Sequence, residues 1–171
     1  MTHSFILGID SGNTVTKAAV FSEAGNLISL GDCEVARIKP RPRFVERDMN
    51  AHWQMTCQAI RQAIGKAVEQ AGIDPSQIAA VTATGHGDGL YLVDEDGAPL
   101  GNGIVSLDSR SAPVIERWEA EGVHDEALKI TGQMPYAPAP SARCGGSRKT
   151  NRSAMAASAG FSPARTGFDT S

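Results

Sequence analysis

Short apolar runs alternate with polar turns at the start of the chain. Residues 5–9, 16–21 and 27–30 are apolar runs of strand length, and Gly and Asn occur in the segments between them, 10–14 and 23–26. Apolar runs bounded by such turn residues are typical of strands. Because the connections are short, the pattern predicts three neighbouring strands in an antiparallel meander.

A long helix is predicted after the polar, proline-containing segment 37–47. Asp48 is a suitable N-cap, because its carboxylate can accept from the free N–H groups of a first helical turn. Gly72 is a suitable end, because glycine adopts the left-handed conformation without steric cost. Between these residues, apolar side chains recur at helical spacing. They are Trp53, Cys57, Ile60, Ile64 and Val68.

The second half of the chain mixes strand and helix patterns. The predicted strands are 78–84, 90–93 and 104–107, and the predicted helices are 111–121 and 125–131. A glycine-rich loop, 85–89, follows the first of these strands, and a hairpin turn, 94–97, follows the second. Strands followed by strands mixed with helices indicate an α/β fold with a mixed sheet.

Composition and charge narrow the class of protein. The chain has 171 residues, of which 41% are hydrophobic and 20% charged, as in an ordinary globular domain. The net charge of −3 argues against a nucleic-acid partner. No apolar run approaches the roughly 20 residues of a membrane helix, and the N-terminus lacks the basic start of a signal peptide. Three cysteines without CxxC spacing favour a reducing, cytoplasmic setting.

The composition changes near residue 142, which divides the chain into a domain, 1–142, and a tail, 143–171. The domain is acidic, whereas the tail has one acidic residue, Asp169, among several basic ones, and no Leu, Ile or Val. Such a segment buries too little apolar surface to offset the entropy lost on ordering. We therefore expect the tail to be disordered.

The turn after the first strand has the composition of a phosphate and metal site. Asp10, at the end of a buried strand, can offer a carboxylate to Mg²⁺, and Gly12 lets the backbone turn tightly beside an anion. Backbone N–H groups and short polar side chains form an anion-binding concavity. The GxxxxGKS/T pattern of a P-loop is absent, and a plain β-hairpin with a polar turn is the alternative. The candidate residues are Asp10, Ser11, Gly12, Asn13, Thr14 and Lys17.

Two later loops carry ligand-binding chemistry. The loop at 84–89 places alternating glycines between two strands, so that a ligand can approach the backbone. The loop after the strand 104–107 adds a carboxylate and a guanidinium. A flexible connection is the alternative for the earlier loop, and a helix N-cap is the alternative for the later one. The candidate substrate-binding residues are His86, Gly87, Asp88, Asp108 and Arg110.

In this order, the loops resemble the N-terminal domain of the FGGY family of carbohydrate kinases. Residues 8–14 match the family's opening phosphate motif, with Lys17 where an arginine is usual. Residues 42–48 match its P-x-W-x-E-x-D stretch, with Phe44 in place of the tryptophan. The sugar loop and the strand and turn at 101–111 also match. The sequence is similar to the pentulose kinases, notably the L-xylulose kinase type, over residues 4–142.

The resemblance implies an actin-like, ribonuclease-H-like ATPase fold, of which this chain would form the N-terminal lobe. The family transfers the γ-phosphoryl group of ATP to a sugar hydroxyl, which requires positioning and charge neutralisation. By resemblance, Asp10 would hold Mg²⁺, and the phosphates of ATP would lie against Thr14 and Lys17. The polar residues of the two later loops would orient the sugar or polyol, although the sugar loop departs from the family pattern at His86 and its two successors.

The family's catalytic base, an Asp, lies by resemblance well beyond residue 171, so we expect no catalytic residue in this chain and no activity of the chain alone. A truncated lobe would also expose surface that favours self-association. The alternatives are a non-catalytic sugar- or partner-binding module and another kind of actin-like ATPase.

The family likeness stops abruptly after Ala142. In a reading frame moved by one base, residues 143–161 can be rewritten as a charged amphipathic helix and the start of a strand, which resembles the family sequence at this point. We therefore expect the tail to be a frameshift product. Gene sequence that reads through in the original frame would contradict this expectation.

Overall fold

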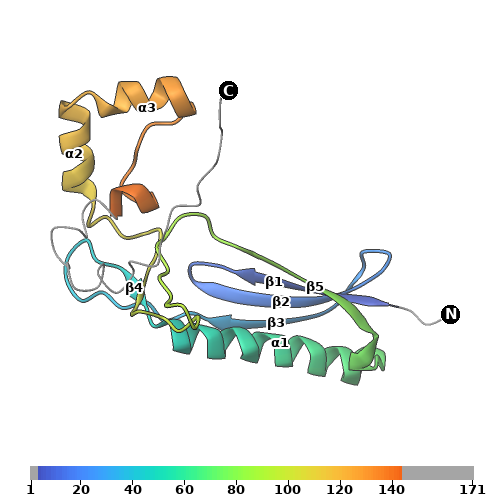
Figure 1. Ribbon diagram of the computed structural model, residues 1–171. Coiled ribbons are helices and arrows are strands. Elements are labelled where there is room, and N and C mark those ends of the chain that lie inside the picture. The colour runs from blue at the N-terminus through green and yellow to red at the C-terminus, as the bar shows by residue number, and fades with distance from the viewer. Residues whose placement is uncertain (1–3, 144–171) are drawn as a thin grey trace.

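The computed structural model describes residues 4–143 and shows an α/β fold built on a mixed sheet (Figure 1). The strand order in the sheet is β3-β2-β1-β5. β1 (Phe5–Ser11), β2 (Val15–Ser22) and β3 (Leu27–Glu34) form the antiparallel meander that the sequence predicts. β5 (Ile78–Gly85) pairs with β1 in parallel, which makes the sheet mixed, as expected.

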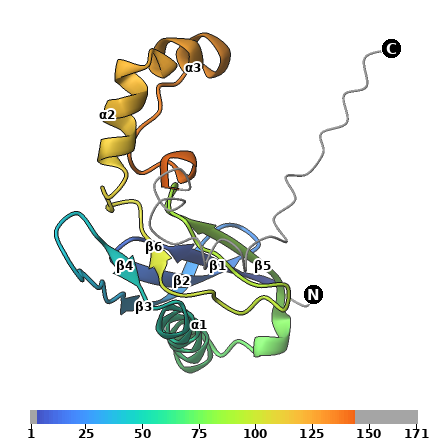
Figure 2. The same cartoon turned by 60° about the vertical axis from the view of Figure 1, so that its left-hand side comes forward.

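The helix α1 (Met49–Ala71) lies along one face of the main sheet (Figures 1 and 2). Both predicted caps are confirmed. The Asp48 carboxylate accepts from the Ala51 N–H at 2.8 Å, and Gly72 has a left-handed φ of 64° and donates to the Val68 carbonyl. The core lies between α1 and the sheet, where the apolar side chains of β1 and β2 alternate inward and outward.

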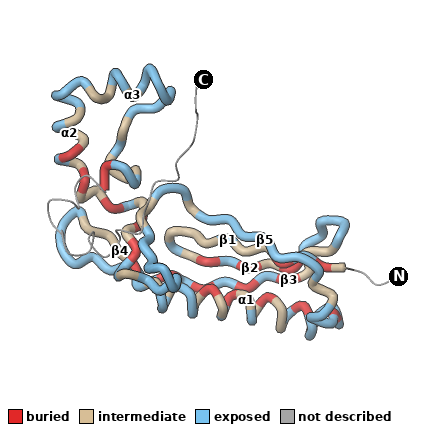
Figure 3. Tube along the Cα trace, in the orientation of Figure 1, coloured by how far each residue is buried: buried red, intermediate tan, exposed pale blue. Residues whose placement is uncertain are grey.

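The most buried face of α1 is offset from the apolar stripe that predicts the helix, although Ile60 and Ile64 of that stripe pack against the core. The buried residues are Thr56, Ala59, Ala63 and Ala67. Trp53, from the predicted stripe, is 64% exposed. Small residues let the helix backbone approach the sheet, and a Cβ on Gly31 of β3 would lie 2.2 Å from the Ala59 carbonyl oxygen. Close packing of the two backbones therefore sets which side of α1 faces inward (Figure 3).

The second half of the chain forms a small sheet and a helical arm. β4 (Glu46–Arg47) pairs with β6 (Gly103–Ile104), and the short helix η1 (Pro75–Gln77) connects α1 to β5. The two predicted helices are confirmed as α2 (Ala112–Ala120) and α3 (Val123–Thr131), which stand away from the main sheet in Figures 1 and 2. Among the helices of the described residues, none is long and apolar enough to cross a membrane.

Two predicted strands are wrong in extent. Residues 90–93 form only isolated bridges. The run at 104–107 is a strand only at Ile104, because the Asp108 N–H donates to the Val105 carbonyl and turns the chain. An apolar run becomes a strand only where a neighbour offers a full ladder of hydrogen bonds, and a local pattern does not show this.

The last described residue, Arg143, is fully buried. Its guanidinium donates to the carbonyl oxygens of Ile104 and Val105 at 2.9 and 2.8 Å. Arg143, which the sequence assigned to the tail, thus packs against the domain. The rest of the expected disordered or frameshifted tail, 144–171, lies outside the described residues.

Candidate functional site

The three candidate loops meet at one end of the main sheet. β1 and β5 are parallel, so the loops after them start side by side, with Ser11 opposite Gly85. The His86 N–H donates to the Ser11 carbonyl at 3.1 Å and joins these two loops. The segment that leads into the third loop joins the first loop through Asn13, whose side-chain amide exchanges hydrogen bonds with the Ser106 hydroxyl at 2.9 and 3.2 Å. The structure therefore brings all three loops together.

The first loop, residues 12–14, turns tightly between β1 and β2. The Gly12 N–H donates to the Val15 carbonyl at 3.1 Å, and a Cβ on Gly12 would lie 2.5 Å from that same oxygen. Any side chain there would force the backbone to move. The Thr14 carbonyl accepts from the Val35 N–H at 2.8 Å, while Thr14 itself is exposed. Backbone hydrogen bonds to Val15 and Val35 therefore hold the loop in place, while Thr14 stays exposed.

Asp10 and Lys17 lie side by side on the face of the sheet opposite α1. They are cross-strand partners on β1 and β2, and both are exposed. With Thr84 of β5 they line a shallow hollow of about 290 Å³. Within residues 4–143, the Asp10 carboxylate has no hydrogen-bond or ion-pair partner, and no cluster of metal-binding side chains forms. Mg²⁺ is commonly held by one carboxylate with phosphate and water, and Asp10 fits that role.

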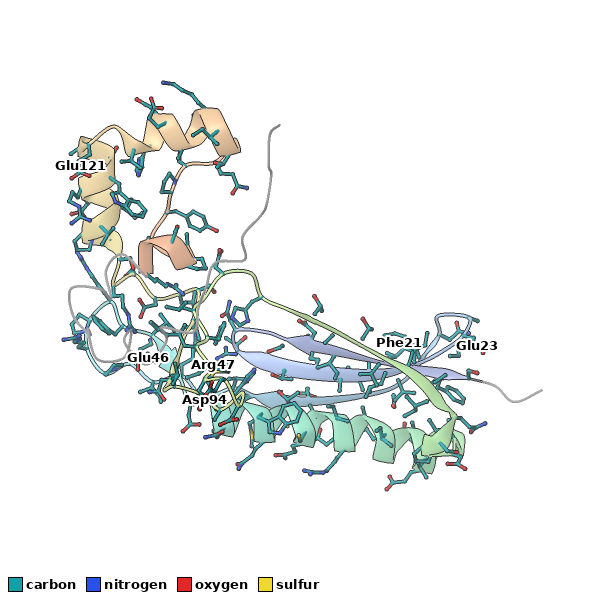
Figure 4. All side chains as sticks on the ribbon, in the orientation of Figure 1. Phe21, Glu23, Glu46, Arg47, Asp94 and Glu121 are labelled. Carbon is teal, nitrogen blue, oxygen red and sulfur yellow. The ribbon has the colours of Figure 1, made fainter. Side chains whose placement is uncertain are left out.

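A buried cation lies under the first loop and has no counterpart in the sequence predictions. Arg47, on β4, is 1% exposed. Its Nη2 donates to the Gly12 and Asn13 carbonyl oxygens at 3.2 and 3.0 Å. Its Nη1 lies 3.4 Å from His52 Nε2, which lies 2.9 Å from Ser11 Oγ. Figure 4 shows Arg47 at the end of the main sheet, near the start of α1.

Two basic side chains, Arg47 and His52, face one another beneath the first loop. Burial lowers the pKa of His52 below its ordinary value, and the charges of Arg47 and His86 lower it further. Burial also lowers the pKa of Arg47, but a guanidinium stays charged at neutral pH. Because Arg47 can only donate, His52 Nε2 is the acceptor between them. Within residues 4–143, His52 Nδ1 is buried without a hydrogen-bond partner.

In the second loop Gly87 is exposed, whereas His86 is partly buried and hydrogen-bonded within the protein. His86 Nδ1–H donates to the Ser11 carbonyl at 2.9 Å, and His86 Nε2 is hydrogen-bonded to the Tyr91 hydroxyl. Both ring nitrogens are therefore engaged by the protein. A Cβ on Gly87 would meet no atom within 4 Å, so the space beside this backbone is open.

Asp88 stands at the exposed end of the second loop. Its φ of 62° lies in the left-handed region, which is uncommon for a residue with a side chain. The Tyr136 hydroxyl, from the segment after α3, donates to Asp88 Oδ1 at 2.7 Å, and this bond raises the pKa of Tyr136. The two residues are distant in sequence, so no local pattern indicates that they meet. The helical arm thereby contributes a side chain to the edge of the site.

The third loop uses Asp108 as an internal support. Its fully buried carboxylate accepts from the Val45 N–H at 2.7 Å and from the Arg110 N–H at 3.0 Å. The Arg110 guanidinium pairs with Asp108 at 2.8 Å and with Glu46 at 2.7 Å. It also lies 4.0 Å from the centre of the Phe44 ring. The Asp108 carboxylate is therefore committed to the protein, whereas Arg110 remains partly exposed.

The mixed sheet and its strand order are those of the N-terminal part of an actin-like ATPase fold, as the sequence predicts. Residues 5–143 match the FGGY family of carbohydrate kinases, N-terminal domain. The match includes most of the chain, and the chain belongs to this family.

Individual relatives agree with this assignment. A probable L-xylulose kinase of Haemophilus influenzae is 35% identical over 129 residues, which are 75% of this chain and 26% of that protein. A glycerol kinase of Thermococcus onnurineus is 37% identical over 134 residues, 78% of this chain and 26% of that protein. The crystal structure of xylulose kinase from Rhodospirillum rubrum has a TM-score of 0.78 at 19% identity, over 90% of this chain and 30% of that one. The chain thus spans about a quarter of the length of the curated relatives.

Proposed function

We propose that this chain forms part of an ATP-dependent kinase for a small sugar, a pentulose or a related polyol. The observation that supports this best is the meeting of the first and second loops where β1 and β5 end side by side. Phosphoryl transfer requires the donor phosphate and the acceptor hydroxyl to be held together. Adjacent loops, one suited to phosphate and one to a polyol, provide that arrangement.

The phosphates of ATP would lie against the first loop. Asp10 would hold Mg²⁺, which supplies charge neutralisation at the phosphates. Lys17, the cross-strand partner of Asp10, adds a fixed positive charge beside it. The backbone of the turn would contribute N–H donors. The remaining residues of this proposed contact are Ser11, Gly12, Asn13 and Thr14.

The sugar would lie against the exposed groups of the second and third loops. Asp88 accepts hydrogen bonds from hydroxyl groups, Arg110 donates them, and Gly87 leaves room for the ring or chain. His86 would position the second loop through its hydrogen bond to the Ser11 carbonyl at the end of β1. Asp108 would act by holding Arg110.

We expect the 171-residue chain to bind substrate without transferring a phosphoryl group by itself. The family resemblance assigns the catalytic base and the second lobe to parts of the relatives that this chain does not match. The chain matches 26% of the Haemophilus protein. We also propose that the protein is located in the cytoplasm.

Isothermal titration calorimetry with L-xylulose, D-xylulose and glycerol tests the proposed sugar site. We expect a pentulose to bind the wild-type chain, and Asp88→Asn to weaken binding about tenfold, because a charge-assisted hydrogen bond is worth roughly 1.5 kcal/mol. Asp96→Asn, in the exposed hairpin after the second loop, is the matched control and should bind like wild type. No binding of any of these polyols, or equal losses in both variants, would contradict the proposal.

A further inference from the structure

Arg47 is buried without an acidic partner in the described part of the chain. None of the ion pairs within residues 4–143 includes it, and its Nε is buried there without a hydrogen bond. A buried charge without a counter-ion is costly. The contacts that its guanidinium makes therefore indicate what this arginine does.

The two carbonyl groups that Arg47 contacts determine the direction of two N–H groups. The C=O of Gly12 shares a peptide unit with the N–H of Asn13, and the C=O of Asn13 shares one with the N–H of Thr14. In a trans peptide unit these groups point in opposite directions, and no cis peptide bond occurs in the described residues. By binding both carbonyl groups, Arg47 turns both N–H groups away from itself.

The two N–H groups have no acceptor of their own. Within residues 4–143, neither the Asn13 N–H nor the Thr14 N–H donates a backbone or side-chain hydrogen bond. They lie in a turn whose Thr14 is exposed. Adjacent free N–H groups on the open side of a turn form the concavity that binds anions. The charge of Arg47 behind them adds to the positive potential at that surface.

We propose that Arg47 is a positioning residue that orients the peptide units of the first loop, so that the N–H groups of Asn13 and Thr14 face a phosphate group. The identity of the ligand rests on the proposed function, whereas the orientation rests on the contacts of Arg47 alone. His52 supports the guanidinium, because its Nε2 lies 3.4 Å from Arg47 Nη1 and 2.9 Å from Ser11 Oγ.

Amide hydrogen exchange of the full chain tests the orientation without nucleotide. Arg47→Lys keeps the charge but loses the planar guanidinium, whose Nη2 contacts both carbonyl groups while its Nη1 lies against His52. Arg47→Met loses both the charge and the donors. Arg61→Met, on the exposed side of α1, is the control. We expect the amides of Gly12 and Val35, which anchor the loop, to exchange at least tenfold faster in both Arg47 variants and at the wild-type rate in the control. Wild-type exchange in Arg47→Lys would overturn the proposal.

A measurement on the wild-type chain does not depend on whether an Arg47 variant folds. Nitrogen-15 spectra should show separate, slowly exchanging Nη resonances for Arg47, because two of its donors are held by carbonyl groups. Rapidly averaged Nη resonances would overturn the proposed contact.

Titration with Mg·ADP separates this proposal from the proposed function. We expect the amide resonances of Asn13 and Thr14 to shift in the wild-type chain, and the affinity to fall at least tenfold in Arg47→Lys. Equal affinity in the two proteins would overturn the phosphate role of Arg47. Faster exchange in Arg47→Lys together with no response of the wild-type chain to Mg·ADP would contradict the nucleotide site and support the orientation.

Discussion

His52 lies beneath the first loop, beside the buried guanidinium of Arg47. It contacts Ser11 at the end of β1 and the guanidinium of Arg47. Burial lowers the pKa of His52, and the electrostatic effects of Arg47 and His86 lower it further. In its neutral form, His52 Nε2 accepts from its neighbours. Protonation would remove that acceptor and place a second positive charge beside Arg47.

We predict that His52 makes the fold sensitive to acid. Its pKa in the folded chain is lowered by burial and by the neighbouring charges, so the unfolded state, with a histidine pKa of about 6.5, binds more protons below that pH. Stability should therefore be complete above about pH 6.5 and decrease as the pH falls toward the lowered pKa. Urea unfolding of wild type and His52→Gln, followed by circular dichroism, measures this. The variant should lose less stability on acidification, and an equal loss would contradict the account.

Residues that face the proposed ligands are easier to predict from the sequence than the buried residues that hold the loops in place. Asp10 and Asp88 stand out because each sits among glycine and short polar residues after a strand. Arg47 and His52 come from the segment before α1 and its first turn, and only the folded chain brings them beneath the first loop. Asp108 resembles a ligand-facing carboxylate in sequence, but the structure commits it to Arg110 and to backbone N–H groups. Burial of this kind depends on tertiary contacts, which no local pattern encodes.

The helix α1 was correctly placed by its caps and spacing, but its orientation depends on β3. Its alanine face packs against the sheet because Gly31 offers no side chain at the contact. The predicted apolar stripe only partly overlaps this contact, because Ile60 and Ile64 pack against the core while Trp53 is 64% exposed. Periodicity thus identifies the helix, whereas the shape of the opposing strand determines which of two possible faces is buried.

We predict that Gly31→Ala weakens the packing of α1 on the sheet. The new Cβ would lie 2.2 Å from the Ala59 carbonyl oxygen and 2.7 Å from the Ala63 nitrogen. Both are backbone atoms, so the helix must shift, and overpacking of this kind costs about 1–3 kcal/mol. The control is Gly65→Ala on α1, where a Cβ meets no atom within 4 Å and alanine should stabilise the helix by up to about 1 kcal/mol. Urea unfolding measures both, and equal changes would contradict the packing described.

Within residues 4–143, no strand pairs with the outer side of β5 in the main sheet. β5 is one of the two edge strands of that sheet, has no charged residue, and is exposed at every position after Ile78. Edge strands of this kind pair readily with another chain, and charged residues ordinarily prevent it. The self-association expected from the sequence therefore has a specific candidate surface.

We predict that the chain self-associates through β5. Val81, which is 62% exposed near the middle of the strand, is the position at which a charge should interfere most. Val81→Lys should shift the protein toward monomer in size-exclusion chromatography with light scattering. Val68→Lys, at an exposed position on α1 away from this edge, is the control and should behave like wild type. A wild-type chain that is monomeric at high concentration would contradict this prediction.

The central claim is that the loops after β1 and β5 form one site for a small sugar and a magnesium nucleotide. The most direct test is an amide NMR titration of the full chain with L-xylulose, and then with Mg·ADP added. We predict that the sugar shifts the resonances of residues 86–89 and 108–110, and that the nucleotide shifts those of residues 10–17. No shift at saturating ligand, or shifts confined to the helical arm of α2 and α3, would contradict the claim.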